Sequence, residues 1–591
     1  MMEKTNKMRY IILFLFVSVS STVSSQISTI KYVDTKITID GQFDEPIWSQ
    51  LEKHTGFYNY LPTDVGLATN QTVVKLFHNR EFLYVSATYN DSTPKTQVGT
   101  LKRDVSIAFS DAFIMILDTQ NQQQNGYFFA VNSLGNQTDG LVGRSNENYN
   151  LSFSWNAIWQ SKAVLNGNKK QYELAIPLKA LNYNANNATF GIQFYVRDIK
   201  NNSWTVFKNV KRNYANLDLR FTEKFIIENL PKTSTSRFTA IPSVTTSYQK
   251  EIERDNEQTT SKPSLDLQYN LTSSLKLDAA INPDFSQIDV DQQVTNLTRF
   301  AVNFPERRNF FLENSDLFSN LGVPGVNPFY SRRIGASSPI KFGVKLSGNL
   351  SAKTRIGLLN VQTGKEGDLH PQNFGVVVAE QQLSKNFTTT GYLVNRQETN
   401  GVSLQEDYNR VAGINVNFKS ANNKWIGVAN VGQSFTDGLS GDNGFYNMGV
   451  WYNKRGLAWN ASVKKVERNY ITDVGFTPRL YNFDAINNHV VREGFTQTTA
   501  GVEYQKFYEN SKSVNSIRYV NYRNNMYLDA SGNLTQSSHF FNSAVFFKDL
   551  SAIYYVYTYD VVALKYGFDP LGNGNSLLPG NYQFGLLKLG Y

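Results

Sequence analysis

Residues 446–464, YNMGVWYNKRGLAWNASVK, show most directly how this chain folds. Apolar and polar side chains alternate on both sides of the turn 453–456, with apolar positions at Tyr446, Met448, Val450, Tyr452, Leu457, Trp459, Ala461 and Val463. The same alternation recurs at 412–418 and 541–547. Strands of about ten residues with one apolar face, and with aromatic side chains near their ends, are typical of transmembrane β-barrels.

We therefore expect residues 237–591 to form a transmembrane antiparallel β-barrel of roughly sixteen strands. A closed barrel pairs every backbone group in lipid and leaves no edge. The alternative is a large soluble sandwich or propeller, but no blade-length repeat is visible. The last strand, 582–591, alternates Leu587, Leu589 and Tyr591, which resembles the assembly signal of bacterial outer-membrane barrels.

The composition of the chain agrees with an all-β protein. The 591 residues include 33 Tyr and 40 Phe but no Cys, and charged residues make up 18%. Abundant rings argue against disorder and suit pleated sheets. The absence of Cys excludes disulfides, thiolate metal sites and cysteine nucleophiles. The net charge of +9 is scattered along the chain, so we expect no nucleic-acid partner.

The N-terminus has the pattern of a cleaved secretory signal peptide, residues 1–25. Basic residues precede a short apolar core at 11–19, and small residues at 23–25 precede Gln26. An apolar core of this length is too short to span a bilayer, which argues against the alternative of an uncleaved anchor. We expect export to the cell outer membrane of a Gram-negative bacterium, with periplasmic or secreted locations as alternatives.

Residues 26–230 are predicted to form a soluble β-sandwich, because short strands alternate with Asn- and Gly-rich turns. The expected strands are 36–39, 72–77, 82–89, 112–117, 127–131, 171–176 and 190–196.

Residues 282–339 do not fit a barrel strand. This long segment is charged and aperiodic, and phenylalanines lie between its arginines and carboxylates. Charged side chains face lipid only at high cost. We expect the segment to fill the lumen or cap one mouth, with its Arg and carboxylate groups paired to each other and to the wall. Structural ion pairs are favoured over a transport or catalytic role.

Two stretches resemble known families. Residues 39–48, Ile-Asp-Gly-Gln-Phe-Asp-Glu-Pro-Ile-Trp, are similar to the D-G-x-x-D-E-x-x-W opening of the family 9 carbohydrate-binding module. Further matching stretches are 110–113, 117–119, 155–159 and 173–181. The resemblance covers most of residues 31–230 and implies a carbohydrate-binding-module-like β-sandwich with a capacity to bind glycans.

The second resemblance lies in residues 282–291 (NPDFSQIDVD), 296–298 (NLT), 304–313 (FPERRNFFLE) and 329–335 (FYSRRIG). These resemble an outer-membrane barrel family known as domain of unknown function 5916, whose members usually carry the family 9-like module in front. The resemblance implies a sandwich fused to an outer-membrane barrel and supplies no settled activity.

The candidate carbohydrate-binding residues are aromatic and polar side chains of the N-terminal region. Trp155 and Trp159 would share one face of an extended strand, and sugar rings stack on such aromatic faces. The full candidate set is Trp155, Trp159, Tyr149, Tyr127, Asn132 and Arg144, with Gln137 and Asp139 as further polar groups. The alternative is that Trp155 and Trp159 are core residues, and Trp48 is expected to be a structural anchor.

Cofactor and enzyme signals are sparse. No cofactor is required, and calcium is the one candidate, because related modules hold it with oxygen ligands such as Asp91, Asp111 and Asp118 would offer. The five His include no H-x-x-x-H pair, and no G-x-S-x-G, P-loop or H-E-x-x-H motif is present. No catalytic residue is assigned. Glycoside hydrolysis needs only two carboxylates, so sequence alone leaves it open.

Three functions follow from these observations. The leading one is a cell-envelope protein that captures a polysaccharide or oligosaccharide through its N-terminal region, with the barrel in outer-membrane lipid as an anchor or uptake channel. The second is a glycoside-hydrolase-type enzyme of carbohydrate breakdown. The third is a structural envelope protein whose sandwich docks protein partners.

Overall fold

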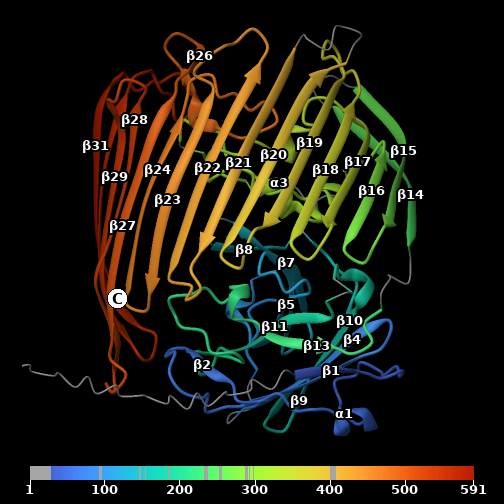
Figure 1. The fold of residues 1–591 in the computed structure, drawn as a ribbon. Coiled ribbons are helices and arrows are strands. Elements are labelled where there is room, and N and C mark those ends of the chain that lie inside the picture. The colour runs from blue at the N-terminus through green and yellow to red at the C-terminus, as the bar shows by residue number, and fades with distance from the viewer. Residues whose placement is uncertain are drawn as a thin grey trace, which may run out of the picture.

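The computed structural model describes residues 28–591 apart from 92–95, 105, 146–147, 154, 184, 186, 232–236, 252–255, 286–290, 292, 297 and 400–406. The predicted signal peptide, residues 1–25, lies outside the described residues. Nearly all elements are strands, and they form two large sheets, one below the other in Figure 1. No helix in the described part of the chain is long and apolar enough to cross a membrane.

The lower unit is a β-sandwich built from a 13-stranded sheet. Its strands are β1 (Ser28–Tyr32), β2 (Tyr58–Leu61), β3 (Thr72–His78), β4 (Phe82–Asn90), β5 (Ala112–Asp118), β6 (Asn125–Asn132), β7 (Gln137–Ser145), β8 (Asn148–Ser152), β9 (Gln160–Asn166), β10 (Lys169–Pro177), β11 (Thr189–Asp198), β12 (Ser203–Val206) and β13 (Glu223–Ile227). Its short helices are α1 (Pro46–Gln50), η1 (Ile107–Phe109), η2 (Leu178–Ala180) and η3 (Leu219–Phe221).

The strand order is β8-β7-β6-β5-β11-β13-β1-β3-β4-β10-β9. Strand β1 pairs in parallel with β13 on one side and with β3 on the other, so it joins the two layers of the sandwich. The main core lies between these layers, where Phe113 and Phe129 of one layer belong to the same buried cluster as Leu76 and Leu174 of the other. The predicted sandwich is confirmed. One predicted strand, 36–39, is wrong, because this segment is irregular and packs Ile37 and Ile39 around Trp48.

The D-G-x-x-D-E-x-x-W stretch is a structural anchor for β10. Backbone N–H groups of Asp40 and Gly41 donate to Glu173 at 3.1 and 2.9 Å, and the Trp48 indole N–H donates to the same carboxylate at 3.2 Å. Gly41 has φ +84°, and a Cβ there would meet Val164 at 2.6 Å, so only glycine suits this position. Trp48 is fully buried, which confirms its structural role.

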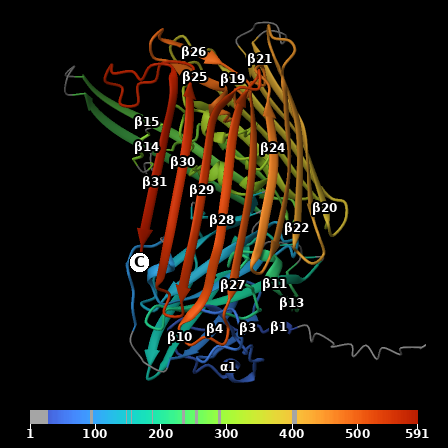
Figure 2. The same ribbon diagram turned by 90° about the vertical axis from the view of Figure 1, so that its left-hand side faces the viewer.

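The upper unit is an antiparallel 16-stranded sheet that curves into a barrel wall (Figures 1 and 2). Its strands are β14 (Phe238–Glu251), β15 (Asn256–Asn270), β16 (Leu275–Ile281), β17 (Ile340–Asn349), β18 (Thr354–Thr363), β19 (Gln372–Gln382), β20 (Phe387–Glu398), β21 (Tyr408–Lys419), β22 (Trp425–Thr436), β23 (Gly444–Lys454), β24 (Leu457–Val466), β27 (Phe495–Phe507), β28 (Val514–Asp529), β29 (Leu534–Phe547), β30 (Ala552–Leu564) and β31 (Gly580–Gly590). A far loop adds η5 (Pro478–Leu480), β25 (Tyr481–Asp484) and β26 (His489–Arg492).

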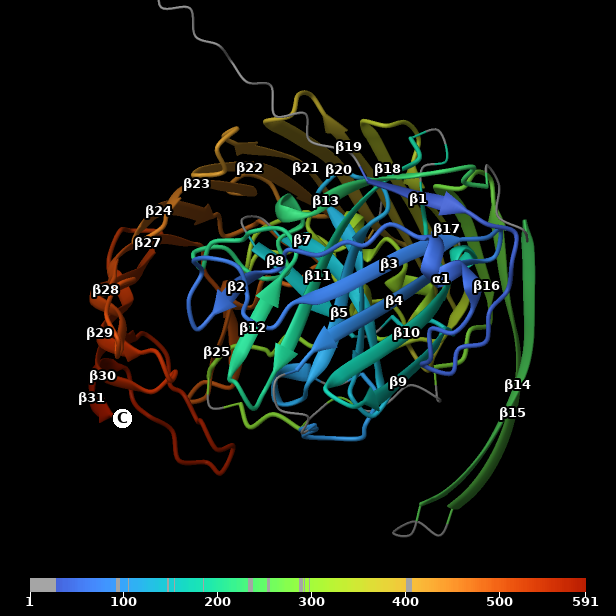
Figure 3. The same ribbon diagram turned by 90° about the horizontal axis from the view of Figure 1, so that it is seen from below.

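The number and direction of the strands confirm the predicted barrel architecture, but the sheet is not closed. Among the described residues no pairing joins β14 to β31, so these two strands are the edges of the sheet. Figure 3 shows a wide opening between β14 and β15 on one side and β31 on the other.

The outer face of the barrel wall is largely apolar, and its inner face carries polar side chains together with apolar ones that pack on the luminal segment. Met448 is 69% exposed and Ile414 is also exposed, whereas the neighbouring Asn415 and Asn430 are buried on the inner face. This is the arrangement expected for a wall whose outer face meets lipid and whose inner face meets a filled lumen.

The described residues of 282–339 lie inside the barrel, which confirms the predicted luminal placement. The segment includes α2 (Asn309–Leu312), α3 (Ser315–Ser319) and η4 (Ser331–Arg333). Its Phe311, Phe318 and Phe329 share a buried cluster with Val376 and Val394 of the wall. We call this segment the luminal segment.

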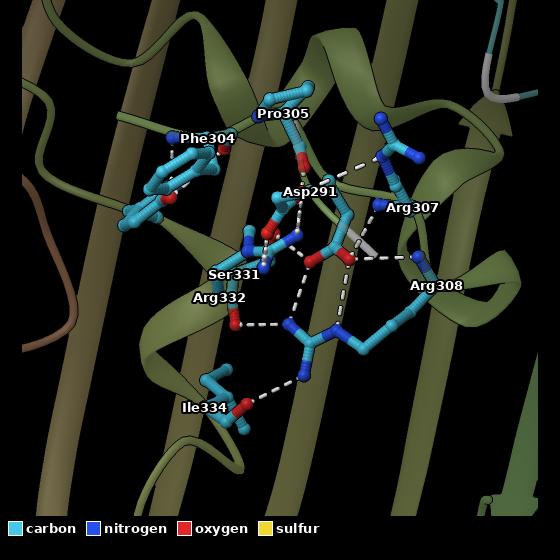
Figure 4. Close-up of polar contacts among 10 residues, drawn as sticks. Asp291, Phe304, Pro305, Arg307, Arg308, Ser331, Arg332 and Ile334 are labelled. Carbon is cyan, nitrogen blue, oxygen red and sulfur yellow. Dashed lines mark hydrogen bonds and ion pairs between the residues drawn. The ribbon is translucent and has the colours of Figure 1, made fainter. Parts of the chain in front are cut away.

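Several charges of the luminal segment are paired, as predicted (Figure 4). Arg308 donates to the Glu306 carboxylate at 2.7–2.9 Å and to the carbonyl oxygens of Ser331 and Ile334 at 2.6 Å. Arg332 contacts Asp291 in the same network. Pairing of this kind compensates the cost of removing the charges from water.

The sandwich docks on the lower end of the barrel wall in Figure 1. The buried carboxylate of Asp64 forms an ion pair with Arg455 at 2.8 Å. The Asn213 side chain bonds to Asn453, and the Asn349 amide donates to Gln120 at 2.9 Å. The two units therefore share a polar interface at the mouth of the barrel wall.

Candidate functional site

A large hollow lies at the junction of the sandwich, the barrel wall and the luminal segment. Its volume is about 740 Å³, within the range of ligand pockets. We call it the junction pocket. Its lining includes residues of all three parts, among them Tyr127, Trp155, Asn156, Ile158, Trp159, Gln160, Asn182, Lys276, Glu313 and Asp316.

Three of the predicted aromatic residues line this pocket together. The ring of Trp155 packs against Tyr127 at 5.0 Å between centroids, and both Trp155 and Trp159 meet the edge or face of Phe129, at 6.0 and 5.2 Å. Trp155 and Tyr127 are half-buried, whereas Trp159 is buried. Burial raises the pKa of the Tyr127 hydroxyl, and this hydroxyl accepts a hydrogen bond from the Asn182 backbone at 2.8 Å. Trp155 therefore keeps part of its ring surface exposed at the pocket.

Residues 153–159 are not the strand that the sequence predicts. Strand β8 ends at Ser152 and β9 begins at Gln160, so both tryptophans lie on the connection between them. They nevertheless face the same side, because both pack on Phe129. The loop leaves Ile158 at its tip 94% exposed beside the pocket.

Asp139 holds this connection in place. Its buried carboxylate accepts hydrogen bonds from the Trp159 indole N–H at 3.1 Å and from the Ala157 backbone at 2.6 Å. Arg103 donates to Asp139 at 2.7 Å and to the Asn156 side chain at 2.8 Å. The group that sequence reasoning offered as a ligand contact is therefore used to fix the loop that carries Trp155. Gln137, the other such group, donates to the Trp159 carbonyl at 3.1 Å.

The remaining predicted site residues lie elsewhere. Asn132 is buried at the far end of β6, where its side-chain oxygen accepts from Leu134 and Asn136 at 3.0 Å and closes a turn. Tyr149 is buried, donates to the Gln123 carbonyl at 2.9 Å, and lines a different hollow. Arg144 lies in β7 opposite Tyr149, and its side chain is outside the described part of the structure.

Further polar groups complete the pocket, and no signal in the sequence marks them. Asn156, Gln160 and Asn182 offer amides at its rim, and Glu313 and Asp316 of the luminal segment form its wall. Both carboxylates are in ion pairs, Glu313 with Lys276 at 2.5 Å and Asp316 with Arg355 at 2.7 Å. The pocket thus combines aromatic rings with hydrogen-bonding amides and internally paired charges. Such a surface suits an uncharged ligand rich in hydroxyl groups.

The three acids proposed for calcium are engaged in other contacts. The buried ammonium group of Lys170 lies 2.9 Å from Asp91 and 3.0 Å from Asp111. Burial opposes the charge of Lys170, but the two carboxylates hold its pKa above the ordinary value. Asp118 accepts backbone N–H bonds from Gln120 and Gln123, and burial raises its pKa to about 6. No cluster of three or more His, Asp or Glu ligands is present among the described residues, and calcium stays a prediction.

The fold and the pocket define the class of this protein, a β-sandwich joined to a transmembrane-type antiparallel β-barrel. Within the barrel unit, residues 234–362 match the family model described as domain of unknown function (DUF5916). This match confirms the resemblance seen in residues 282–335. No curated protein sequence matches the chain.

Several solved structures are similar to parts of this chain. A family 9 carbohydrate-binding module from Caldicellulosiruptor kristjanssonii in complex with cellotriose is 18% identical and covers 34% of this chain and 95% of its own, with a TM-score of 0.26. A putative carbohydrate-binding protein from Bacteroides uniformis is 11% identical, with coverages of 34% and 98% and a TM-score of 0.28. OccAB2 of Acinetobacter baumannii is 8% identical, with coverages of 80% and 98% and a TM-score of 0.26. The fold assignment rests on the topology described above.

Proposed function

We propose that this chain is a saccharide-binding protein of the outer membrane, in which the junction pocket binds an uncharged oligosaccharide or the end of a polysaccharide. The barrel anchors the pocket in the membrane. No reaction is assigned to it.

The observation that carries this proposal is the half-buried Trp155 ring in the wall of the junction pocket. A pyranose presents an apolar face of C–H groups, and a ring platform removes that face from water. The hydroxyl groups around the sugar require amide partners, which Asn156, Gln160 and Asn182 supply at the rim. Asp139 fixes the loop before the ligand arrives, which reduces the ordering cost of binding.

Calorimetry on the full chain in detergent micelles tests the proposal, with a panel of neutral oligosaccharides that includes cellotriose. We expect Trp155→Ala to weaken the binding of a panel hit about tenfold or more, since loss of a stacking ring costs roughly 1–2 kcal/mol. Trp204→Ala is the matched control, because Trp204 is half-buried in β12 and is absent from the pocket lining. Equal affinities of Trp155→Ala and the parent protein would contradict the proposal, as would a panel without a hit.

The anchoring role has its own test. The luminal segment packs against the inner wall through the cluster around Phe311, Phe318 and Phe329. We therefore expect sucrose-gradient fractionation to find the protein with the outer membrane, and planar bilayers with the purified protein to show no steady conductance. A stable conductance would instead favour an uptake channel.

A further inference from the structure

The connections between barrel strands differ strongly between the two ends of the wall. At the sandwich end they are 271–274, 350–353, 383–386, 420–424, 455–456, 508–513 and 548–551. At the opposite end the connections include short ones such as 530–533, but also the three longest, 282–339, 467–494 and 565–579. Outer-membrane barrels have short turns on the periplasmic side and long loops on the extracellular side.

The sandwich is attached to the short turns. Arg455 reaches Asp64, the Asn202 amide donates to the Asp549 carbonyl at 3.4 Å, and the Gln122 amide donates to the Ala352 carbonyl at 2.9 Å. These three contacts come from separate turns around the mouth, so the sandwich is held across the mouth rather than at one point. Figures 1 and 2 both show the sandwich below this end and the long connections, including β26, at the other.

The luminal segment stands between the long loops and the junction pocket. The Asn415 side chain of β21 donates to the Leu321 carbonyl at 3.0 Å, and Lys464 of β24 donates to the Pro324 carbonyl at 2.8 Å, so two strands of the wall hold the segment. Glu313 and Asp316 of the same segment form part of the pocket wall. A sugar chain that arrived from the long-loop end would have to displace this packed segment. The exposed Ile158 loop instead borders the pocket from the sandwich side.

We propose that the sandwich caps the periplasmic end of the barrel, and that the junction pocket takes a glycan of the periplasm rather than a polysaccharide outside the cell. The statement about the glycan rests on the proposed function, whereas the orientation rests on the loops and contacts alone. The protein then presents a binding site to the periplasmic space from a membrane anchor.

The chain contains no cysteine, so single-cysteine variants report orientation without background. Two variants lie in the sandwich: Ile158→Cys places a thiol at the pocket, and Leu165→Cys places one on the exposed side of β9. The third, Leu571→Cys, lies in the long connection 565–579, where Leu571 is 69% exposed. Cells whose fractionated outer membranes contain the variant are treated with a maleimide coupled to a polyethylene glycol too large for general porins. The same treatment is repeated after the outer membrane is permeabilised.

We expect L571C to react in intact cells, and I158C and L165C to react only after permeabilisation, with at least a tenfold difference in labelled fraction. Labelling of L165C in intact cells would overturn the orientation, and so would protection of L571C. All three thiols must react in denaturant, which shows that each is present. Orientation is read without any sugar, so a failed oligosaccharide panel with the expected labelling would remove the proposed function and leave the capping arrangement standing. The reverse result would move the binding site to the cell surface.

Discussion

The sandwich and the barrel wall place their apolar side chains in opposite directions. In the sandwich, Phe113 and Phe129 point between two layers and the other faces are covered by loops and short helices. In the wall, Met448 and Ile414 point outward, and the inner face holds amides and ion pairs. A strand pattern of period two therefore specifies a sheet but not which of its faces meets solvent.

The difference lies in what each interior contains. The sandwich interior is filled by its own two layers, whereas the barrel interior is filled by a separate segment of the same chain. Because the luminal segment brings arginines and carboxylates, the inner wall must offer polar partners, as Arg355 does for Asp316. The junction pocket lies where the two kinds of interior meet, which explains its mixture of rings and charges.

The largest effect is expected in the sandwich core. Phe129 has no exposed surface and supports both Trp155 and Trp159. Phe129→Ala should lower the free energy of unfolding of the sandwich by about 3–5 kcal/mol through lost burial and a residual cavity. Urea titration followed by tryptophan fluorescence measures this. Phe584→Ala on β31, where the ring is 56% exposed, is the matched control and should have a much smaller effect; equal losses would contradict the contrast between the two sheets.

The second effect tests whether the outer face of the barrel wall meets lipid. Met448→Lys puts a charge on the outer face near the middle of β23 and should destabilise the folded barrel in liposomes by about 2–4 kcal/mol. Asn447→Lys is the neighbouring control, because Asn447 lines an inner hollow of about 460 Å³ that has room for the longer side chain. We expect its cost to stay within about 1 kcal/mol, apart from the lost hydrogen bond to Asn430. Gel mobility of folded and unfolded forms across a urea series gives both numbers, and similar costs at both positions would argue against a lipid-facing outer surface.

Much of the fold could be predicted because its signals are local. The alternation at 446–464 spans one hairpin, and β23 and β24 pair across the turn that the sequence marks. The open edges of the sheet could not be predicted in this way, since they depend on how β14 curves relative to β31, far apart along the chain. Long-range curvature leaves no trace in a period-two pattern.

The site was predictable only in part for the same reason. Trp155 and Trp159 carry an aromatic signal that stands out in a short stretch, and Tyr127 joins them through β6. The loop conformation that unites the two tryptophans depends on Asp139, which the sequence alone presented as a ligand group. Glu313 and Asp316 reach the pocket from the luminal segment, and no spacing rule connects them with the sandwich.

A pH titration sharpens the comparison, because the sandwich buries the carboxyl group of Glu173. Burial raises the pKa of Glu173 from 4.5 to about 7, in spite of the hydrogen bonds from Gly41 and Asp40. Between these two pH values the folded state keeps a proton that the unfolded state has lost, so the stability of the sandwich should fall as the pH rises through this range. Urea midpoints at several pH values measure the slope.

Glu173→Gln should remove most of this slope, and Asp118→Asn should remove a further part, since burial also raises the pKa of Asp118, to about 6. In Glu173→Gln the amide oxygen can accept either from the Trp48 indole or from the backbone N–H groups of Asp40 and Gly41, but not from both. The variant therefore also loses some stability at every pH, and the slope with pH is the quantity to compare. A sandwich whose stability rises with pH across this range would show that Glu173 is ionised when folded.

The smallest effect concerns the interface between the two units. Burial opposes the charge of Asp64, but the Arg455 guanidinium and the Arg212 backbone N–H hold the pKa of Asp64 below its ordinary value. Arg455→Met should cost about 1–2 kcal/mol, because the buried carboxylate keeps only its bonds from the sandwich itself. Hydrogen exchange locates the loss: amides of β2, β12 and the turn 455–456 should exchange faster, while those of β5 in the sandwich core should not change. In the parent protein the same amides should also exchange faster in acid, once Asp64 is protonated at a pH below its ordinary pKa. Acceleration in β5 as well would mean that docking and sandwich folding are one cooperative event, and the two sheets would then be a single folding unit in spite of their opposite faces.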